Sequence, residues 1–240
     1  MRIDTLPQYT KLPSNHISNC TVIVVDVLRA STSIITAVQN GAQQIVPTAD
    51  AGEAAAVVGR LGLRDCVLAG ERGGEKLSGF DIGNSPSEFS KSLVGGKTVV
   101  ISTTNGTVAI HGLSSAKTLL IGGMINKTAI AKKALELKND VLIVCAGTDG
   151  NVSADDICAA GAIADAIVNN SDETVDLTDF TRVSIALYKD LHDERFDLSK
   201  TRHFSRLVEL GFEKDTELCF EEDVTDVVPV YANGIITLFR

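Results

Sequence analysis

Residues suited to chemistry gather in four short segments of this chain, each directly after an apolar run. The first is Asp26-Val-Leu-Arg29-Ala-Ser31. Its carboxylate could ligate a metal or act as nucleophile or base, and Arg29 could grip a phosphate or carboxylate through two parallel hydrogen bonds. A helix beginning near Ser31 would offer free N–H groups to an anion. Ser31 could equally cap that helix while Asp26 pairs with Arg29, so this segment alone leaves a structural role open.

The second segment, from Gly70 to Pro86, combines glycines with charged side chains. Its glycines let the backbone approach a ligand closely, at an entropic cost that a purely structural loop has little reason to bear. Asn84-Ser85-Pro86 is typical of a helix start. A surface loop is the alternative, and the mixture of charges disfavours it. The charged residues are Glu71, Arg72, Glu75, Lys76 and Asp81.

The third segment, residues 102–107, is rich in hydroxyls and contains Thr104 and Asn105. A hydroxyl-rich strand end that enters a helix resembles a phosphate cradle. The lysine and the spacing of a P-loop are missing, which disfavours nucleotide hydrolysis of that type. Ordinary helix capping explains the segment equally well.

The fourth segment runs from Cys145 to Asp156. Ser153 suits a helix cap, and Asp155 and Asp156 would then lie in the first turn, where the helix dipole favours negative charge. Asp149, between glycine-rich turns, is left as a candidate ligand. Cys145 could be a nucleophile, but no histidine lies near it in the sequence.

The histidines fall outside these four segments, and we expect all of them to be solvated or hydrogen-bonded in ordinary ways. They are His16, His111, His192 and His203. A serine hydrolase is disfavoured because the G-x-S-x-G motif is missing. The carboxylates, arginines, hydroxyls and backbone donors of the four segments suit metal-assisted chemistry on a phosphate ester. Carboxylate oxygens favour Mg²⁺ over zinc.

Predicted strands and helices alternate along residues 20–168, and these elements must position the four segments. Apolar, β-branched runs of strand length predict strands, and the segments between them predict helices. Because the runs are apolar throughout, the strands should be covered on both faces, which indicates a layered α/β/α fold with a largely parallel sheet. The expected strands are 21–25, 44–46, 66–69, 98–101, 118–121 and 141–145, and the expected helices are 31–38, 50–61, 86–94, 105–113, 126–138 and 154–169.

Residues 171–240 differ in character. An acidic linker (172–179) leads into a polar helical region (178–210), and Asn233-Gly234 between apolar runs predicts a β-hairpin. We expect one α/β domain over 1–240, with this C-terminal part forming either a smaller subdomain or an antiparallel extension of the sheet.

Composition and hydropathy indicate which partners and which compartment the protein is suited to. A net charge of −9 and a pI near 4.9 argue against nucleic acid as a partner. The sequence shows no signal-peptide core and no apolar run of the roughly 18 residues that a membrane span needs. The 5 cysteines form no CxxC pair, which suits thiols in a reducing compartment. We therefore expect a cytoplasmic protein without membrane contact.

Several blocks of the sequence resemble, in the same order, the signatures of the 2-phosphosulfolactate phosphatase family. The second of them is long and specific. One departure lies in the fourth segment, where Asp155-Asp156 stands in place of the glutamate–aspartate pair of the family pattern. The blocks are 25–30, 70–74 with 79–86, 103–107, 145–147 and 226–230.

This resemblance implies a Mg²⁺-dependent phosphatase that hydrolyses 2-phospho-3-sulfolactate, or a related 2-phosphohydroxy acid, to the hydroxy acid and phosphate, a step towards coenzyme M. It also implies a homodimer. The expected site residues fall into three sets. They are the catalytic residues Asp26, Arg29, Glu71 and Arg72, the substrate-binding residues Ser31, Lys76, Asn84, Ser85, Thr104 and Asn105, and the Mg²⁺ ligands Asp26, Glu71, Asp81 and Asp149.

Two other functions are weighed against this one. A phosphatase of the haloacid-dehalogenase type would need an acid at position 28, where Leu28 stands. A non-catalytic domain that binds a small anion would gain nothing from carboxylates such as Asp26, Glu71 and Asp81 around its ligand.

Overall fold

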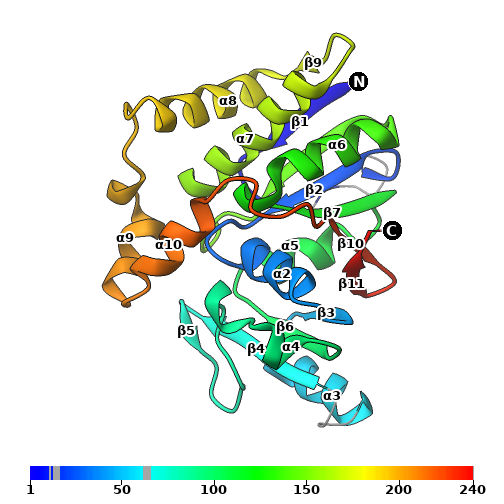
Figure 1. Ribbon diagram of the computed structural model, residues 1–240, viewed down its shortest axis with the longest axis vertical. Coiled ribbons are helices and arrows are strands. Elements are labelled where there is room, and N and C mark those ends of the chain that lie inside the picture. Colours follow the sequence, from blue (N-terminus) through cyan, green and yellow to red (C-terminus); the bar gives the residue numbers. More distant parts are fainter. Residues whose placement is uncertain (11, 13–16, 62–65, 240) are drawn as a thin grey trace.

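A mixed, mostly parallel β-sheet with helices on both faces forms the centre of the molecule (Figure 1). This confirms the predicted α/β class. The computed structural model describes residues 1–10, 12, 17–61 and 66–239. Its strands are β1 (Arg2–Leu6), β2 (Thr21–Val25), β3 (Gln44–Thr48), β4 (Cys66–Arg72), β5 (Glu75–Lys76), β6 (Thr98–Ser102), β7 (Thr118–Gly122), β8 (Val141–Cys145), β9 (Asp176–Leu177), β10 (Pro229–Ala232) and β11 (Ile235–Leu238).

The strand order is β5-β4-β6-β3-β11-β10-β7-β2-β8-β1-β9. The predicted C-terminal hairpin is β10–β11, and it lies inside the sheet, between β3 and β7. Both of its outer pairings are antiparallel. The hairpin therefore joins two parallel groups of strands, β4-β6-β3 on one side and β7-β2-β8-β1 on the other, that run in opposite senses.

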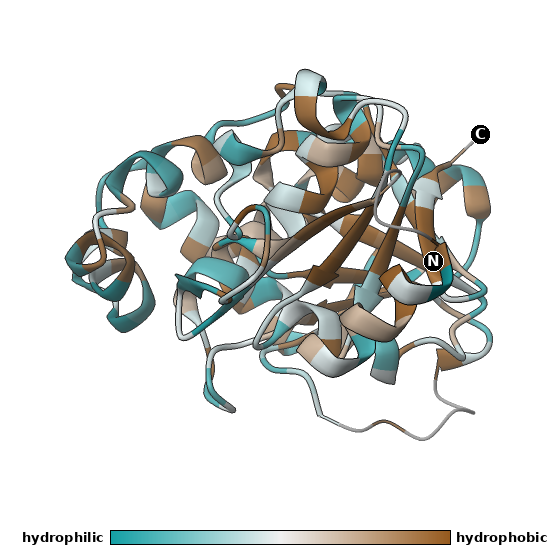
Figure 2. Ribbon diagram, turned by 90° about the horizontal axis from the view of Figure 1, so that it is seen from below, coloured by the Kyte–Doolittle hydropathy of each residue, from teal (hydrophilic) through white to brown (hydrophobic). Residues whose placement is uncertain are grey.

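Helices on the two faces bury the alternate residues of the strands. On β2, Val22 and Val24 pack with α2 and α5, whereas Ile23 and Val25 pack with α6 and α7. The strands are accordingly hydrophobic along their length (Figure 2). The helices are α2 (Ala30–Gln39), α3 (Ala51–Leu61), α4 (Lys91–Val94), α5 (Gly106–Gly112), α6 (Lys127–Leu137), α7 (Ala154–Asn170), α8 (Asp179–His192), α9 (Arg202–Glu209) and α10 (Glu213–Phe220).

Between residues 70 and 94, local structure differs from the prediction in two places. The glycine-rich segment continues β4 to Arg72 and turns back into β5, because Gly73 and Gly74 both adopt the positive φ of a tight hairpin turn. The helix expected over 86–94 is a 3₁₀ turn, Pro86–Glu88, followed by α4, since the Glu88 carboxylate accepts the N–H groups of Gly83 and Ser85.

The strands β1 and β9 at one end of the sheet were not predicted. β1, which pairs with β8 and with the edge strand β9, buries only alternate residues, and β9 comes from the acidic linker. The polar region 178–210 contains α8, a 3₁₀ turn (Leu198–Lys200) and α9. Among the described helices, none is long and apolar enough to cross a membrane.

Candidate active site

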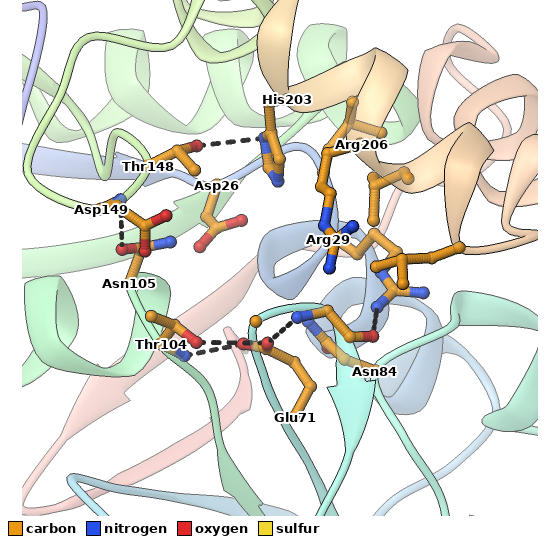
Figure 3. Close-up of a pocket in the computed structure, with 15 residues that line it drawn as sticks. Asp26, Arg29, Glu71, Asn84, Thr104, Asn105, Thr148, Asp149, His203 and Arg206 are labelled. Atoms are coloured by element: carbon orange, nitrogen blue, oxygen red, sulfur yellow. Dashed lines mark hydrogen bonds between the residues drawn. The ribbon is translucent and has the colours of Figure 1, made fainter.

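A cavity of about 260 Å³ lies where the loops after β2, β6 and β8 meet the β4–β5 hairpin and helix α9 (Figure 3). Loops from both parallel groups of strands therefore contribute to one site. The residues that line it are Asp26, Leu28, Arg29, Glu71, Gly73, Gly74, Asn84, Thr104, Asn105, Thr148, Asp149, His203, Arg206, Leu207 and Leu210.

Asp26 is held at the end of β2 by the turn that leads into α2. Its N–H donates to Ser31 Oγ at 2.9 Å, its carbonyl accepts the N–H of Ser31 at 2.8 Å, and its carboxylate accepts the N–H of Ala30 at 3.2 Å. Ser31 is buried and lies outside the cavity lining. Its hydroxyl therefore fixes the Asp26 turn in this structure.

The Asp26 carboxylate is itself nearly buried, with 7% of the residue exposed. Burial raises its pKa to about 6, and the negative charges of Glu71 and Asp155 add to this, while His203 and the Ala30 N–H act in the opposite direction. Near neutral pH this group can therefore accept or release a proton, as general acid–base catalysis requires.

Gly106, the first residue of α5, sits directly beneath this carboxylate. A Cβ at position 106 would lie 2.7 Å from Asp26 Oδ2 and 2.7 Å from the Ala30 side chain. Only glycine therefore lets the loop after β6 approach the loop after β2 this closely.

Glu71 ties the β4–β5 hairpin to the loop after β6. One carboxylate oxygen accepts the N–H of Thr104 at 2.7 Å, and the other accepts the N–H of Gly74 at 2.8 Å and the hydroxyl of Thr104 at 3.2 Å. Both oxygens of Glu71 are thus engaged by the protein, although the residue borders the cavity.

Arg29 is buried and paired within the protein. Its guanidinium donates to Asp215 Oδ2 at 2.6 Å and to the Gly74 carbonyl at 2.8 Å, and it stacks 4.1 Å from the centre of the Phe212 ring. Asp215 also accepts the hydroxyl of Ser85 at 2.6 Å. Arg29 and Ser85 therefore fasten α10 to the core, and Ser85 does not line the cavity.

Besides Ser85, three expected site residues of the second segment lie outside the cavity lining. Arg72 donates to the carbonyls of Glu71 and Ala49 and to Ser102 Oγ. Lys76 and Asp81 are exposed, and the Asp81 carboxylate accepts the N–H of Leu68 at 2.8 Å.

Asn84, Thr104, Asn105 and Asp149 do come together around the cavity (Figure 3). Asn105 Oδ1 accepts the N–H of Asp149 at 3.2 Å. The Oδ1 atom of Asn84 is buried and, within the part of the chain that the structure describes, accepts no hydrogen bond. An unsatisfied buried oxygen beside a cavity is suited to receive a ligand donor or a cation.

His203, predicted to be solvated or hydrogen-bonded in an ordinary way, instead lies on the cavity wall close to Asp26 (Figure 3). Its Nδ1 is 3.0 Å from Asp155 Oδ2 and 3.1 Å from Thr148 Oγ1. Burial lowers the pKa of His203, but the hydrogen bond and charge of Asp155, with the charge of Asp26, raise it above its ordinary value overall. Of the other histidines, His16 lies outside the described residues.

The spacing of residues along α9 was the sequence pattern that could have identified His203 as a site residue. His203, Arg206, Leu207 and Leu210 recur every three or four residues and so share one face, which lies against the cavity. The predicted site residues all came from segments after predicted strands, and α9 follows no strand.

Asp155 and Asp156 do lie in the first turn of α7, as expected, but their contacts extend beyond that helix. Asp156 accepts the N–H groups of Val27 and Gly147 at 2.9 Å each, and so joins the loops after β2 and β8. Burial and the neighbouring Asp155 and Asp26 charges raise the pKa of Asp156 well above its ordinary value.

Cys145 is fully buried at the end of β8. Burial and the charges of Asp156 and Asp155 raise the pKa of its thiol well above its ordinary value. A thiol kept protonated and away from the cavity is not suited to be a nucleophile.

Taken together, an α/β fold with a carboxylate and an aspartate-linked histidine in a polar cavity defines an enzyme site for acid–base chemistry on a small polar ligand. Sequence comparison agrees with this class. The family model described as 2-phosphosulpholactate phosphatase matches residues 7–234. The chain belongs to the 2-phosphosulfolactate phosphatase family, as the resemblance of its motifs had indicated.

Relatives at full length support the same conclusion. A protein of Clostridium acetobutylicum is 39% identical over 98% of this chain and 100% of its own length. One of Clostridium tetani is 41% identical, again over 98% of this chain and 100% of its own length. Both carry the name probable 2-phosphosulfolactate phosphatase.

Proposed function

We propose that this protein hydrolyses the phosphate monoester of a small 2-hydroxy acid, 2-phosphosulfolactate above all, to the hydroxy acid and phosphate. The observation that carries the proposal is the position of the Asp26 carboxylate, which directly follows the buried strand β2 and lines the cavity, where burial raises its pKa to about 6. Membership of the family and the names of the relatives supply the substrate to test first.

Charge is the main obstacle to binding such a substrate. Phosphosulfolactate carries phosphate, carboxylate and sulfonate groups, whereas Asp26, Glu71 and Asp149 line the cavity with carboxylates. The buried charge of Arg29 is already matched by Asp215. Arg206, whose side chain is 56% exposed, lines the cavity, and among the described residues its one ion pair is with Glu209, at 3.6 Å. It is the residue that we assign to the carboxylate or sulfonate of the substrate.

A bound Mg²⁺ would offset the remaining negative charge. Among the described residues, no three His, Cys, Asp or Glu side chains are grouped to hold a metal by themselves. Mg²⁺ is commonly held by one or two carboxylates with water and substrate phosphate oxygens, so such a group is not required. Asp26 and Asp149, with the unsatisfied Oδ1 of Asn84, fit this role. The ion would polarise the phosphoryl group and neutralise charge.

Asp26 has two chemical routes open to it. Its carboxylate can attack phosphorus and form an aspartyl phosphate that water then hydrolyses, or it can take the proton of the water that attacks. Trapping of acid-labile ³²P on the protein by rapid quenching distinguishes the two, because only direct attack labels the protein.

The competing functions find less support in the geometry. Leu28, at the position where the haloacid-dehalogenase type needs an acid, is 3% exposed and apolar. A receptor for anions would use Arg29 to bind its ligand, but here Arg29 forms a buried ion pair with Asp215.

The test is release of phosphate from 2-phosphosulfolactate and from 2-phospholactate, with Mg²⁺ and with EDTA. We expect hydrolysis of both substrates with Mg²⁺ and its loss in EDTA, and loss of activity in Asp26→Asn under every condition. Phosphate release that is absent with Mg²⁺ for all 2-phosphohydroxy acids would refute the proposed activity. Release that persists fully in EDTA would refute the metal alone.

A further inference from the structure

His203 has one ring nitrogen engaged by the protein and one that faces the cavity. Nδ1 lies among three oxygens, at 3.0 Å from Asp155 Oδ2, 3.1 Å from Thr148 Oγ1 and 3.5 Å from Ser153 Oγ. A carboxylate accepts only, so Asp155 fixes a hydrogen on Nδ1. For the described part of the chain, Nε2 makes no hydrogen bond, and Figure 3 shows it turned towards the space beside Asp26 and Arg206.

The support behind the histidine is rigid. Asp155 is fully buried at the start of α7, and its other oxygen accepts the hydroxyl of Ser153. Ser153 is in turn 3.1 Å from Thr148 Oγ1, so Asp155, Ser153 and Thr148 form one closed polar cluster around Nδ1. A buried carboxylate that holds the far nitrogen of a histidine sets its tautomer and stabilises its protonated form.

We propose that His203 is the general acid that protonates the leaving oxygen of the substrate, and that Asp155 is its positioning residue. This inference rests on the proposed phosphatase function. Two further observations favour His203 for the role. It lies in the same cavity as Asp26 but on a different element, α9, so that the two groups can act on different sides of one phosphate. Arg206, the other basic residue of α9 at the cavity, cannot release a proton at ordinary pH.

The chemistry explains why such an acid is needed. The bond between phosphorus and the C2 oxygen breaks with its electron pair on that oxygen, and an alkoxide is a poor leaving group unless it gains a proton. Nε2–H supplies this proton and the imidazole becomes neutral. A new bond to phosphorus forms from water directly, or from Asp26 and then water. The proton that this water loses restores His203, so the cycle needs no other reactant.

A comparison of leaving groups tests this role. p-Nitrophenolate leaves without a proton, whereas the C2 alkoxide of 2-phospholactate needs one. In His203→Gln, which retains hydrogen bonding but cannot donate a proton in this way, we expect kcat/KM for 2-phospholactate to fall by about 10²–10⁴-fold. For p-nitrophenyl phosphate we expect a fall of less than about tenfold. The ratio of the two values does not depend on the fraction of folded protein.

Two further variants sharpen the result. His192→Gln removes an exposed histidine of α8 that pairs with Glu222 outside the cavity, and it should leave both activities unchanged. Asp155→Asn should reduce turnover of 2-phospholactate selectively, and the double variant Asp155→Asn/His203→Gln should be no slower than His203→Gln alone. Such non-additivity is expected of residues that act as one unit.

An equal fall for both substrates in His203→Gln would overturn the inference and leave the proposed function intact, since it would indicate a binding or structural role. Fully additive losses in the double variant would overturn the role of Asp155. If the wild-type protein releases phosphate from neither substrate, the proposed function and the inference fall together.

Discussion

Replacing Asp215 with asparagine is expected to loosen the helical segment that carries His203 and Arg206. Asp215 lies on α10, directly after α9, and its carboxylate forms a 2.6 Å ion pair with Arg29 of the core. The side chains are only 2% and 4% exposed. The substitution leaves the Arg29 charge buried without a counter-charge.

The size of the effect follows from this burial. Removal of one partner of a buried ion pair typically costs about 3–5 kcal/mol. In this case Arg29 keeps its hydrogen bond to Gly74 and its stacking on Phe212, so we expect the lower value, about 3 kcal/mol. That corresponds to a rise of roughly two orders of magnitude in the equilibrium constant for opening.

Hydrogen exchange of backbone amides measures this opening directly. Amides of α9 and α10 should exchange about 100-fold faster in Asp215→Asn, while those of β2 and β8 change little. A matched control is Asp190→Asn on α8, which removes an exposed ion pair with Arg195 and should leave the exchange rates of the α9 and α10 amides close to wild type.

A double variant separates the charge from the packing. Arg29→Met/Asp215→Leu removes both charges and should recover most of the lost protection, because the desolvation cost disappears with them. Wild-type exchange in Asp215→Asn, or a double variant as open as the single one, would refute the assignment of this ion pair as the fastening of α9 and α10.

Three further predictions concern the cavity. Gly106→Ala would place a methyl group 2.7 Å from Asp26 Oδ2, so we expect a loss of about 1–3 kcal/mol in urea unfolding and a fall in kcat of more than about tenfold. Gly59→Ala in α3 has open space and should instead gain up to about 1 kcal/mol. Burial raises the pKa of Asp26 to about 6, whereas the same carboxyl in the unfolded chain releases its proton near pH 4. The protonated carboxyl therefore adds to the free energy of unfolding fully below about pH 4, and this contribution is lost as the pH rises through about 6. Asp26→Asn in EDTA should therefore match wild type in urea unfolding at pH 4 and exceed it by about 3 kcal/mol at pH 8, and an equal difference at both values would contradict the raised pKa. Arg206→Gln should raise KM for 2-phosphosulfolactate about tenfold and leave KM for p-nitrophenyl phosphate unchanged, since only the first substrate has a second anionic group; an equal rise for both would contradict the assigned contact.

The elements that sequence could predict are those with a continuous apolar pattern. The strands around β2 and β8 are buried on both faces, so their composition alone identifies them. β1 buries only alternate residues and includes Arg2, Asp4 and Thr5, and the edge strand β9 has 2 residues, so neither carries such a signal. The position of the β10–β11 hairpin inside the sheet depends on pairing between distant segments, which local patterns do not encode.

The residues of the candidate site were likewise predictable where they follow a strand with such a pattern. Asp26, Thr104, Asn105 and Asp149 lie shortly after predicted strands, Glu71 and Asn84 belong to the glycine-rich segment after another, and all six border the cavity. Arg29 also borders it, but its partner Asp215 is 186 positions away and gives no local sign. His203 was missed because its element follows no strand, and Arg72, Lys76 and Asp81 were included because charge in a loop does not reveal which way a side chain points.

The insertion of β10–β11 between β3 and β7 also sets the order in which the protein can be completed during synthesis. The ribosome makes this hairpin after every other strand of the described sheet, yet the hairpin is what joins the two parallel groups. Glu71 and Thr104 belong to one group, and Asp26 and Thr148 to the other. Until residues 229–238 are available, the two groups can pack together through α2 and α5, but β3 and β7 each lack the neighbouring strand that joins them into one sheet.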